Sequence, residues 1–318
     1  MAKVINIPRR APAAARKDEG GNRFYEWTGR GPTEQFYSVT TMIGMGVPKY
    51  GLPPWYARMA AELAYADVEQ RGKRALKHWA RQGALWVKQQ RADGAKLARI
   101  DESPQGLALR WLKGAAERAR DAAADKGSAV HEASEDLVKE LAREGARLYI
   151  AGDLPAFDER IDPHMASFIR WVNDFRPRFL SAEATVFNRT ESYAGTCDAF
   201  LEIWYRGRWM RLAVDYKSGN RIYAEVAMQV MAYARGEFVG GADGVTEFPV
   251  PEVEGTAVLH LTPKGYDFKF LRFDDAIWRA FLIARENFRW VIETSKTAIG
   301  EAIPQDLEDA LAASVEAI

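Results

Sequence analysis

Two aspartates in one short segment are the residues of this chain best suited to chemistry. Asp198 and Asp215 lie within residues 195–217, where side-chain alternation and the dipeptide Arg206-Gly207 predict a β-hairpin with a two-residue turn. In this register the two carboxylates face each other, roughly 5 Å apart at Cβ. Like charges at that distance repel unless a cation lies between them, so the hairpin predicts a metal site.

The other cross-strand pairs support this register. One face of the hairpin pairs apolar residues, and the other has an aromatic pair and an opposite-charge pair, as neighbouring strands prefer. The expected pairs are Ile203 with Met210, Leu201 with Leu212, Ala199 with Val214, Trp204 with Trp209, Glu202 with Arg211 and Phe200 with Ala213.

Lys217 lies on the same face of the second strand as Asp215, because residues two apart in a strand point the same way. A surface ion pair is the ordinary interpretation of such neighbours. Here, however, Asp215 and Lys217 lie at the end of a buried strand, directly before the turn that starts at Ser218. Charged residues at such a position are typical of a functional site. Ser218 and Arg221, just beyond the strand, are therefore candidates for contacts with a substrate phosphate.

A further polar group lies on the helix expected over residues 222–236. Gln229 interrupts the apolar stripe of that helix, where an unpaired amide would cost roughly 1–3 kcal/mol. Tyr233 follows one turn later on the same face. An ordinary core glutamine bonded to backbone carbonyls is the alternative. We expect Gln229 to have a hydrogen-bonding partner in either case.

His131 is the candidate nitrogen ligand. The pattern predicts a helix over Ala129–Glu144, which begins after a break at Gly127-Ser128 with Ser128 as its cap. His131 lies at the edge of its apolar stripe, and Glu135, one turn on, could hold the imidazole in one tautomer. A structural histidine is the common alternative.

One imidazole and two carboxylates make a hard, mostly oxygen site. Such a site suits Mg²⁺ or Mn²⁺, and the imidazole favours Mn²⁺. The ion could polarise a phosphate oxygen and lower the pKa of a bound water, while a nearby lysine could orient that water or neutralise developing charge. Metal-assisted hydrolysis of a phosphodiester fits this grouping best.

Composition sets the limits of the interpretation. The 318 residues, 47% hydrophobic, are enough for one large core or two modest ones. No segment has the length of a membrane span and no signal peptide is recognised, so a cytoplasmic protein without membrane contact is the simplest expectation. The single cysteine, Cys197, excludes an internal disulfide and a four-thiolate iron–sulfur cluster.

Charge is unevenly distributed along the chain. Residues 1–120 carry 22 Lys+Arg and 11 Asp+Glu, and residues 121–318 carry 22 and 33, so a segment of net charge +11 precedes one of −11. This asymmetry suits a polyanion-binding part beside a metal-binding part, although basic helices with solvated outer faces are the alternative. Four tryptophans in the basic part could stack on bases but are more typical of core: Trp55, Trp79, Trp86 and Trp111.

The pattern as a whole predicts an α/β (α+β) protein. We expect a disordered N-terminal arm over 1–22, a basic α-rich region packed on the core over 23–124, the core over 125–300 and a tail over 301–318. Strands are expected over 24–27, 36–41, 182–188, 257–262 and 267–273, and helices over 55–69, 74–91, from Ser103-Pro104 onward, 163–175 and 274–296.

Four motifs, in order, resemble those of RecB-like exonucleases of the PD-(D/E)XK nuclease superfamily. They are Gly127-Ser-Ala-Val-His131, Gly195-Thr-Cys-Asp198, Asp215-Tyr-Lys217 and Gln229-Val-Met-Ala-Tyr233. The resemblance covers residues 125–295, and Ser38-Val-Thr-Thr-Met-Ile is similar to the N-terminal part of phage-encoded members.

This resemblance implies a restriction-endonuclease-like core, a mixed β-sheet flanked by helices with the hairpin at its centre. It also implies roles for individual residues. His131, Asp198 and Asp215 would bind the metal together with the backbone carbonyl of Tyr216. Lys217 would position or activate the attacking water, and Gln229 and Tyr233 would orient DNA near the scissile phosphate.

The implied function is a metal-dependent DNA exonuclease that uses Mg²⁺ or Mn²⁺ and acts in phage or bacterial recombination, repair or degradation. Its substrate would be single- or double-stranded DNA with a free end, in the cytoplasm of the bacterium or of a phage's host. The lone cysteine sets it apart from relatives with an iron–sulfur cluster. No Gly-x-x-x-x-Gly-Lys-Ser/Thr motif for a nucleotide cofactor is present, so a helicase, like a recombinase or single-strand-binding protein, would be a separate partner. Two alternatives stay open: a flap or single-strand endonuclease, and a nucleic-acid-binding protein that has the nuclease scaffold but little catalysis.

Overall fold

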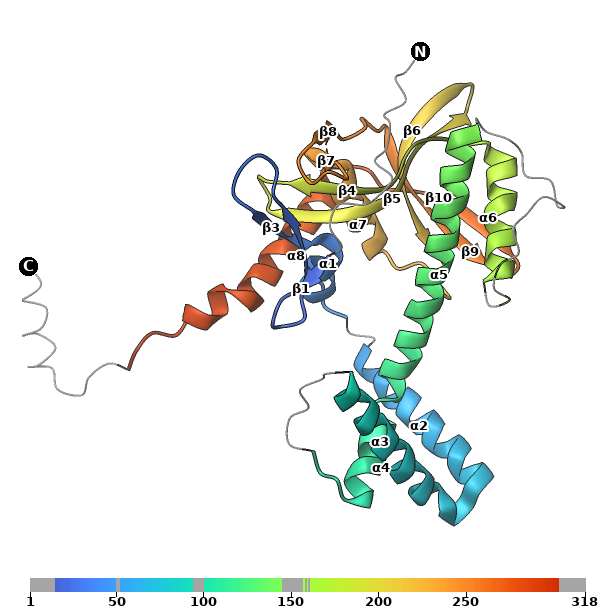
Figure 1. The fold of residues 1–318 in the computed structure, drawn as a ribbon, viewed down its shortest axis with the longest axis vertical. Coiled ribbons are helices and arrows are strands. Elements are labelled where there is room, and N and C mark those ends of the chain that lie inside the picture. Colours follow the sequence, from blue (N-terminus) through green and yellow to red (C-terminus); the bar gives the residue numbers. More distant parts are fainter. Residues whose placement is uncertain are drawn as a thin grey trace, which may run out of the picture.

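A mixed ten-stranded β-sheet with helices on both faces forms the core of the protein (Figure 1). The computed structural model describes residues 15–49, 52–93, 100–144, 157, 159 and 161–302. The strands are β1 (Arg16–Lys17), β2 (Arg23–Trp27), β3 (Glu34–Ser38), β4 (Arg178–Asn188), β5 (Tyr193–Tyr205), β6 (Arg208–Lys217), β7 (Phe238–Gly240), β8 (Glu247–Pro249), β9 (Gly255–Thr262) and β10 (Gly265–Leu271). The α-helices are α1 (Val39–Gly46), α2 (Leu52–Arg71), α3 (Ala75–Ala92), α4 (Pro104–Lys113), α5 (Ala115–Glu144), α6 (Asp162–Phe175), α7 (Glu225–Ala234) and α8 (Asp275–Ile292), with 3₁₀ turns η1 (Gly72–Arg74) and η2 (Thr294–Thr297). The expected class, a mixed sheet flanked by helices, is confirmed.

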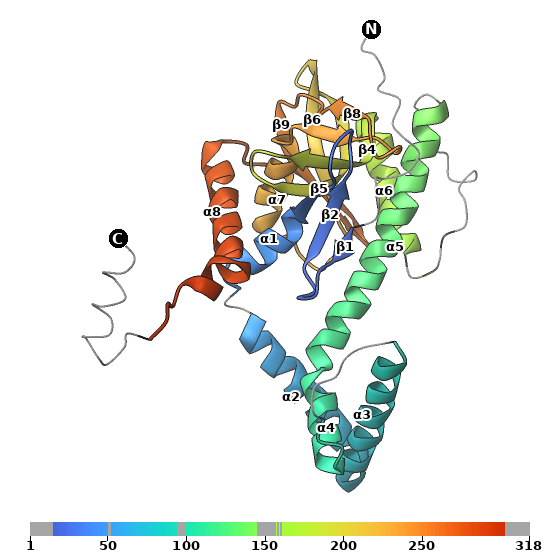
Figure 2. The ribbon, with the colours of Figure 1, turned by 60° about the vertical axis from the view of Figure 1, so that its left-hand side comes forward.

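The two faces of the sheet are covered by different helices (Figures 1 and 2). Side chains alternate along a strand, so Leu201 and Leu212 pack with α5 and α6 on one face, whereas Phe200 and Ala213 pack with α1, α7 and α8 on the other. Strands β3 and β9 join the central hairpin in parallel, β3 beside β5 and β9 beside β6, and most other pairs are antiparallel. The central hairpin is therefore buried on both faces.

The register predicted for the hairpin is confirmed from Tyr205–Arg208 to Ala199–Val214. Arg206 and Gly207 have φ of 50° and 81°. Positive φ at both central residues is what a two-residue turn matched to the strand twist requires. The paired register stops at Ala199 and Val214, one residue short of the two aspartates, so the expected face-to-face pairing of the acids is not part of the regular register.

Helix α5 corrects one prediction. It runs without interruption from Ala115 to Glu144, through the Gly127-Ser128 dipeptide that was expected to end one helix and to cap the next. A glycine inside a helix costs only about 1 kcal/mol relative to alanine. The contacts of α5 with α2 near one end and with α6 and β4 near the other offset that cost.

The N-terminal boundaries also differ from the prediction. Residues 1–14 of the expected disordered arm lie outside the described residues, but Arg16 and Lys17 form β1, which pairs with β2. The strand expected through Thr41 ends at Ser38, whose side chain accepts a hydrogen bond from the backbone N–H of Thr41 and caps α1. Strand β3 pairs with β5 and α1 packs against α8 and α7, so residues 23–49 belong to the core and not to the α-rich region.

Helices α2, α3 and α4 form a group that we call the helical bundle, set apart from the sheet (Figures 1 and 2). Helix α5 extends from this bundle to the sheet. The predicted helix start at Ser103-Pro104 is confirmed, with the Ser103 hydroxyl accepting from the backbone N–H of Gly106. In the expected tail, residues 301–302 are described and 303–318 are not. Among the described residues no helix is both long and apolar enough to cross a membrane.

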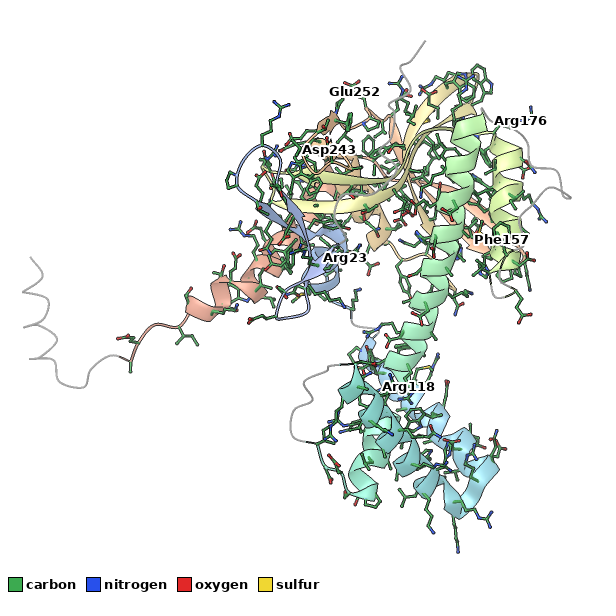
Figure 3. All side chains as sticks on the ribbon, in the orientation of Figure 1. Arg23, Arg118, Phe157, Arg176, Asp243 and Glu252 are labelled. Atoms are coloured by element: carbon green, nitrogen blue, oxygen red, sulfur yellow. The ribbon has the colours of Figure 1, made fainter. Side chains whose placement is uncertain are left out.

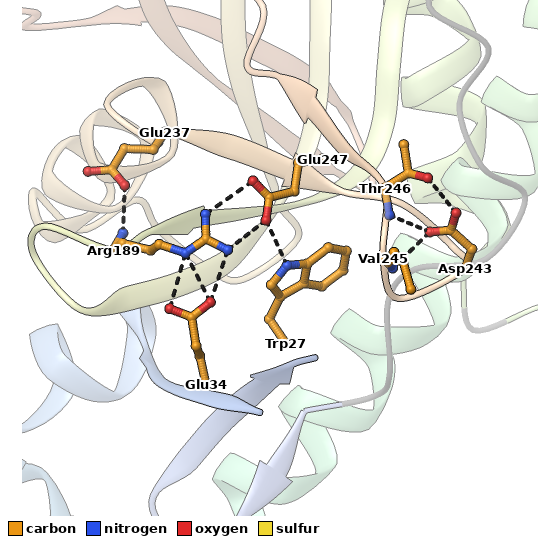
Figure 4. A network of polar contacts seen from close by, with 8 residues as sticks. All are labelled: Trp27, Glu34, Arg189, Glu237, Asp243, Val245, Thr246 and Glu247. Atoms are coloured by element: carbon orange, nitrogen blue, oxygen red, sulfur yellow. Dashed lines mark hydrogen bonds and ion pairs between the residues drawn. The ribbon is translucent and has the colours of Figure 1, made fainter. Parts of the chain in front are cut away.

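Arg189, in the turn between β4 and β5, ties together parts of the sheet that are far apart in sequence (Figure 4). Its guanidinium contacts Glu34 at 2.9 Å and Glu247 at 2.6 Å, and it lies over the ring of Phe238 at 4.4 Å. Hydrogen bonds from Arg189 lower the pKa of Glu247. Beside this network, Asp243 accepts hydrogen bonds from the backbone N–H groups of two loop residues that follow it, at 2.9 and 2.8 Å (Figure 4).

We expect Arg189→Ala to lower the free energy of unfolding by about 1 kcal/mol, because a partly exposed ion-pair network contributes little more than that. Arg189→Lys should lose about half as much, since lysine keeps the charge but not the two-pronged contact. Urea denaturation measures both values. The loss should shrink in 1 M salt, where exposed charges are screened, and an equal loss at low and high salt would contradict an electrostatic role.

Candidate metal and catalytic site

A hollow of about 210 Å³ lies where the central strands meet α5 and α7. It gathers the residues expected to do chemistry, which come from segments far apart in the chain. The residues that line it are Arg23, Tyr25, Ser38, Thr40, His131, Glu183, Gly195, Thr196, Asp198, Asp215, Lys217, Gln229 and Tyr233. Six of the predicted site residues are thus brought to one place.

His131 and Asp198 form one half of the site. The imidazole Nδ1 of His131, from α5, lies 3.4 Å from an oxygen of Asp198, from β5. The other oxygen of Asp198 accepts a hydrogen bond of 2.5 Å from the backbone N–H of Tyr216. Burial alone would lower the pKa of His131, but the Asp198 carboxylate outweighs it and raises that pKa to about 9. Burial raises the pKa of Asp198, and His131 more than reverses this, so the net shift is downward.

Asp215 and Lys217 form the other half. The ammonium of Lys217 lies 2.5 Å from Asp215 Oδ2, and Asp215 is 1% exposed. Burial raises the pKa of Asp215 to about 6 even though Lys217 opposes the shift. Burial lowers the pKa of Lys217, but Asp215 and Asp198 reverse the direction, so the lysine stays charged at neutral pH. Each buried carboxylate thus has its own cation, His131 for Asp198 and Lys217 for Asp215.

Gln229 has the partner that its position in an apolar stripe requires. Its Nε2 donates to Asp215 Oδ1 at 2.7 Å and contacts the hydroxyl of Tyr233 at 3.0 Å, and its Oε1 accepts from Lys217 at 3.5 Å. Gln229 is therefore not an ordinary core glutamine bonded to backbone carbonyls. The Tyr233 ring reaches the site because Gly195 lies opposite it, where a Cβ would come within 2.5 Å of the ring. The amide fixes the orientation of the Asp215 carboxylate.

Glu183 is a site residue that the sequence did not reveal. It lies in β4, where the register that pairs Ala182 with Ala199 and Ala184 with Cys197 places it opposite Asp198. Its φ is 48°, an unusual backbone conformation for a glutamate within a strand and one that often marks a functional position. Burial, and then the charge of Asp198, raise its pKa to about 8. A lone acidic residue in the middle of a mostly buried strand was the signal that could have found it.

Strand β2, the end of β3 and the start of α1 line the hollow from another side. Arg23 and Tyr25 of β2, together with Ser38 and Thr40, line it. The Arg23 guanidinium lies over the Tyr25 ring at 5.5 Å. Figure 3 places Arg23 on the side of the core that faces the helical bundle. No local pattern predicts that these residues reach the site, because their place depends on the parallel pairing of β3 with β5.

Several predicted site residues lie elsewhere. The carboxylate of Glu135 contacts Lys139 at 2.5 Å, so Glu135 is paired with a lysine on its own helix and is not the orienting partner predicted for His131. Arg221 is exposed and its guanidinium lies over the ring of Tyr223 at 4.7 Å. Neither Arg221 nor Ser218 lines the hollow. Tyr216 contributes its N–H to Asp198, while the metal contact predicted for its carbonyl stays a prediction.

The donor atoms of the site fit a small divalent ion. Ligand atoms of His131, Glu183 and Asp198 all lie within 4.8 Å of one another. Mg²⁺ is usually bound by carboxylate oxygens together with water, so these three residues could hold an ion between them. Two carboxylates and one imidazole suit Mg²⁺ or Mn²⁺. Asp215 is not in this closest group, because its oxygens contact Gln229 and Lys217.

Metal binding should release protons and should tighten as pH rises. His131 and Glu183, with pKa values raised to about 9 and about 8, hold protons at neutral pH. Both must lose them to become ligands, so binding of Mn²⁺ at pH 7 should release about two protons, and fewer as pH approaches 9. Calorimetric titration in two buffers of different ionisation enthalpy counts the protons released.

The matched variants are His131→Ala and Glu183→Gln, each of which should release about one proton fewer and bind Mn²⁺ more weakly. His78→Ala, on α3 of the helical bundle, serves as the control histidine and should bind like the wild type. Proton release that is the same in all four proteins would exclude His131 and Glu183 as ligands.

Comparison with known proteins gives no independent assignment. No protein-family model matches the chain. A search of curated proteins also finds no match.

Proposed function

We propose that the protein is a metal-dependent DNA exonuclease of the PD-(D/E)XK type, related to RecB-like nucleases. One observation carries the proposal. His131, Asp198, Asp215, Lys217 and Gln229, which belong to the four motifs of the resemblance, come from two helices and two strands and line a single hollow. The core is a mixed sheet with the β5–β6 hairpin at its centre, which supports a restriction-endonuclease-like arrangement.

His131, Glu183 and Asp198 would hold the ion, with Asp215 beside them. A bound Mg²⁺ or Mn²⁺ would polarise a non-bridging phosphate oxygen and lower the pKa of a water molecule. Hydrolysis then adds the water oxygen to phosphorus and breaks one phosphorus–oxygen bond, with a proton ending on the leaving oxygen.

Lys217 acts in this scheme as a charged group. Because the neighbouring acids raise its pKa, it orients the attacking water and neutralises charge that develops on the phosphate, and it does not serve as a base. Gln229 holds Asp215 in one orientation, so that the acid and the lysine stay at fixed positions while the phosphate reacts.

Arg23 supplies a further cation for the substrate. No Asp or Glu oxygen among the described residues lies within 4.0 Å of its guanidinium, and the residue lines the hollow. The hydroxyl of Thr40, on the same side, can donate a hydrogen bond to a phosphate oxygen. These groups would hold a phosphate that neighbours the scissile one.

A nuclease assay tests the proposal. End-labelled linear duplex, linear single-stranded and circular single-stranded DNA are incubated with the protein in Mg²⁺, Mn²⁺ or EDTA. We expect nucleotides to be released from linear DNA with either metal, no reaction in EDTA, and intact circles. Asp198→Asn should react at least about 10²-fold more slowly, because it removes a ligand charge, whereas the surface variant Asp267→Asn should equal the wild type.

The other outcomes separate the alternatives. Cleaved circles would make the protein an endonuclease. DNA binding without cleavage in any divalent metal would favour a binding protein with a nuclease scaffold. Equal rates for Asp198→Asn and the wild type would place the chemistry outside this hollow.

A further inference from the structure

Helix α3 and the turn before it carry positive charge that no acidic residue of the same segment balances. Residues 72–92 contain Lys and Arg at six positions and no Asp or Glu. Helices that merely keep an outer face in water usually mix acidic and basic residues, because opposite charges three or four positions apart stabilise the helix. This segment has a different composition.

Four of these cations form a stripe on one side of the helix. Arg74, Lys77, Arg81 and Lys88 follow one another at spacings of three, four and seven residues, which keeps them within about 60° of one another around the axis. All four are exposed. We call this face the basic stripe.

The opposite side of α3 packs against α4. Ala75, Gly83 and Val87 are buried there, and a Cβ on Gly83 would come within 2.1 Å of the Leu107 carbonyl oxygen. The close approach of α3 to α4 fixes how the helix is turned. The basic stripe is therefore held facing away from the rest of the helical bundle.

Neighbouring cations are paired and those of the stripe are not. Arg71 contacts Asp67 at 3.3 Å and Arg91 contacts Glu102 at 2.6 Å. In the part of the chain that the structure describes, no Asp or Glu oxygen lies within 4.0 Å of the stripe's nitrogens. Arg74 and Lys77 also lie at the N-terminal end of α3, where the helix dipole disfavours positive charge. The stripe therefore costs stability, which an anionic ligand would recover.

We propose that the basic stripe binds the sugar-phosphate backbone of double-stranded DNA outside the catalytic hollow. The choice of DNA as the polyanion rests on the proposed function. From Arg74 to Lys88 the helix rises about 21 Å, which is about the length of six base pairs. The contact is one of charge with phosphates, so it is independent of sequence.

The position of the bundle suits this role. Arg23, at the hollow, lies on the side of the core toward the helical bundle, and α5 connects the two parts (Figures 1 and 3). Three tryptophans of the bundle have partners within it or on α5: Trp79 donates to Asp67 at 2.6 Å, Arg110 lies over Trp86, and Arg118 of α5 lies over Trp111. The helical bundle is therefore suited to bind DNA phosphates through its positive charges and not to stack on bases.

The test is the salt dependence of duplex binding in EDTA, where no metal-dependent hydrolysis occurs. Binding of a blunt 30-base-pair duplex is measured by fluorescence anisotropy at several salt concentrations. The variant R74Q/K77Q/R81Q/K88Q removes the stripe with residues that favour helix. Each lost phosphate contact lowers the slope of log K against log salt by about 0.9. We expect the slope to fall by about 3 to 4 and the affinity to fall by about tenfold or more at 0.1 M salt.

A matched variant removes the same number of charges from the core. R170Q/K264Q/R279Q/K296Q changes exposed residues of α6, the β9–β10 turn, α8 and η2, and gives the same net charge as the stripe variant. We expect its slope to change by less than about 1. Circular dichroism confirms that both proteins are folded. If the stripe variant does not fold, K77Q/R81Q replaces it, with an expected fall in slope of about 2.

An unchanged slope in the stripe variant would overturn the proposal, as would an equal fall in both variants or a wild type that binds no duplex in EDTA. Because binding is measured without metal, this result is separate from the nuclease assay. A fall in slope specific to the stripe, in a protein that proves unable to cleave DNA, would leave the stripe assigned and the hydrolytic function refuted.

Discussion

Lys217→Ala should lower the rate of DNA hydrolysis at saturating substrate by about 10²–10³-fold, the usual cost of removing one group that stabilises a charged transition state. The ammonium of Lys217 lies 2.5 Å from Asp215 and 3.5 Å from Gln229, so its loss removes positive charge from the centre of the hollow. Asp215 would also lose the cation that opposes the rise in its pKa. Lys217→Arg should recover about tenfold, because it restores the charge but not its position.

Two further measurements identify why Lys217→Ala would hydrolyse DNA more slowly. Mn²⁺ should bind Lys217→Ala at least as tightly as it binds the wild type, because removing a cation from beside the ligands does not weaken them. KM for DNA should change little, since the loss arises in the transition state. The surface variant Lys269→Ala, whose lysine contacts Asp267, is the control. A Lys217→Ala protein that keeps a third of the wild-type rate would remove this residue from the chemistry.

Trp171→Ala should destabilise the fold by about 3–5 kcal/mol, the usual cost of removing a large buried aromatic side chain. Trp171, on α6, is 0% exposed and contacts five aromatic rings. They are Phe168, Phe175, Phe179, Tyr216 and Phe268. Tyr216 lies next to Asp215 in sequence, so this cluster supports the strand that carries the acid.

Trp171→Phe is the matched variant. The indole N–H of Trp171 is buried without a hydrogen-bond partner among the described residues, and phenylalanine removes that unsatisfied group. We therefore expect Trp171→Phe to cost less than half as much as Trp171→Ala. Guanidinium denaturation gives both free energies of unfolding. Equal costs for the two variants would show that the indole itself, and not aromatic packing, is what the core requires.

The sequence was sufficient where local chemistry decides the structure. The hairpin register follows from side-chain alternation and from the turn at Arg206-Gly207, and both are properties of adjacent residues. Gln229 needed a partner because its neighbours on the helix are apolar, and the structure supplies Asp215. The start of α4 followed from Ser103-Pro104 in the same way.

Long-range contacts decided the features that the sequence did not reveal. Glu183 reaches the site through a left-handed backbone conformation and a one-residue shift of register in β4, and neither has a pattern in the sequence. Arg23 depends on the pairing of β3 with β5, which are more than 150 residues apart. Gly127-Ser128 has the local features of a helix end, but the contacts of α5 at both ends override them.

Because α5 is continuous, it fixes how the helical bundle is rotated about the α5 axis relative to the core. His131 and the end of α5 that contacts α2 lie on one helix, and each residue of a helix adds about 100° of rotation and 1.5 Å of rise. Adding or removing a single residue between Ala115 and His131 would turn the bundle by more than a quarter of a circle relative to the imidazole. The number of residues in this part of α5 therefore determines the orientation of the helical bundle relative to the core.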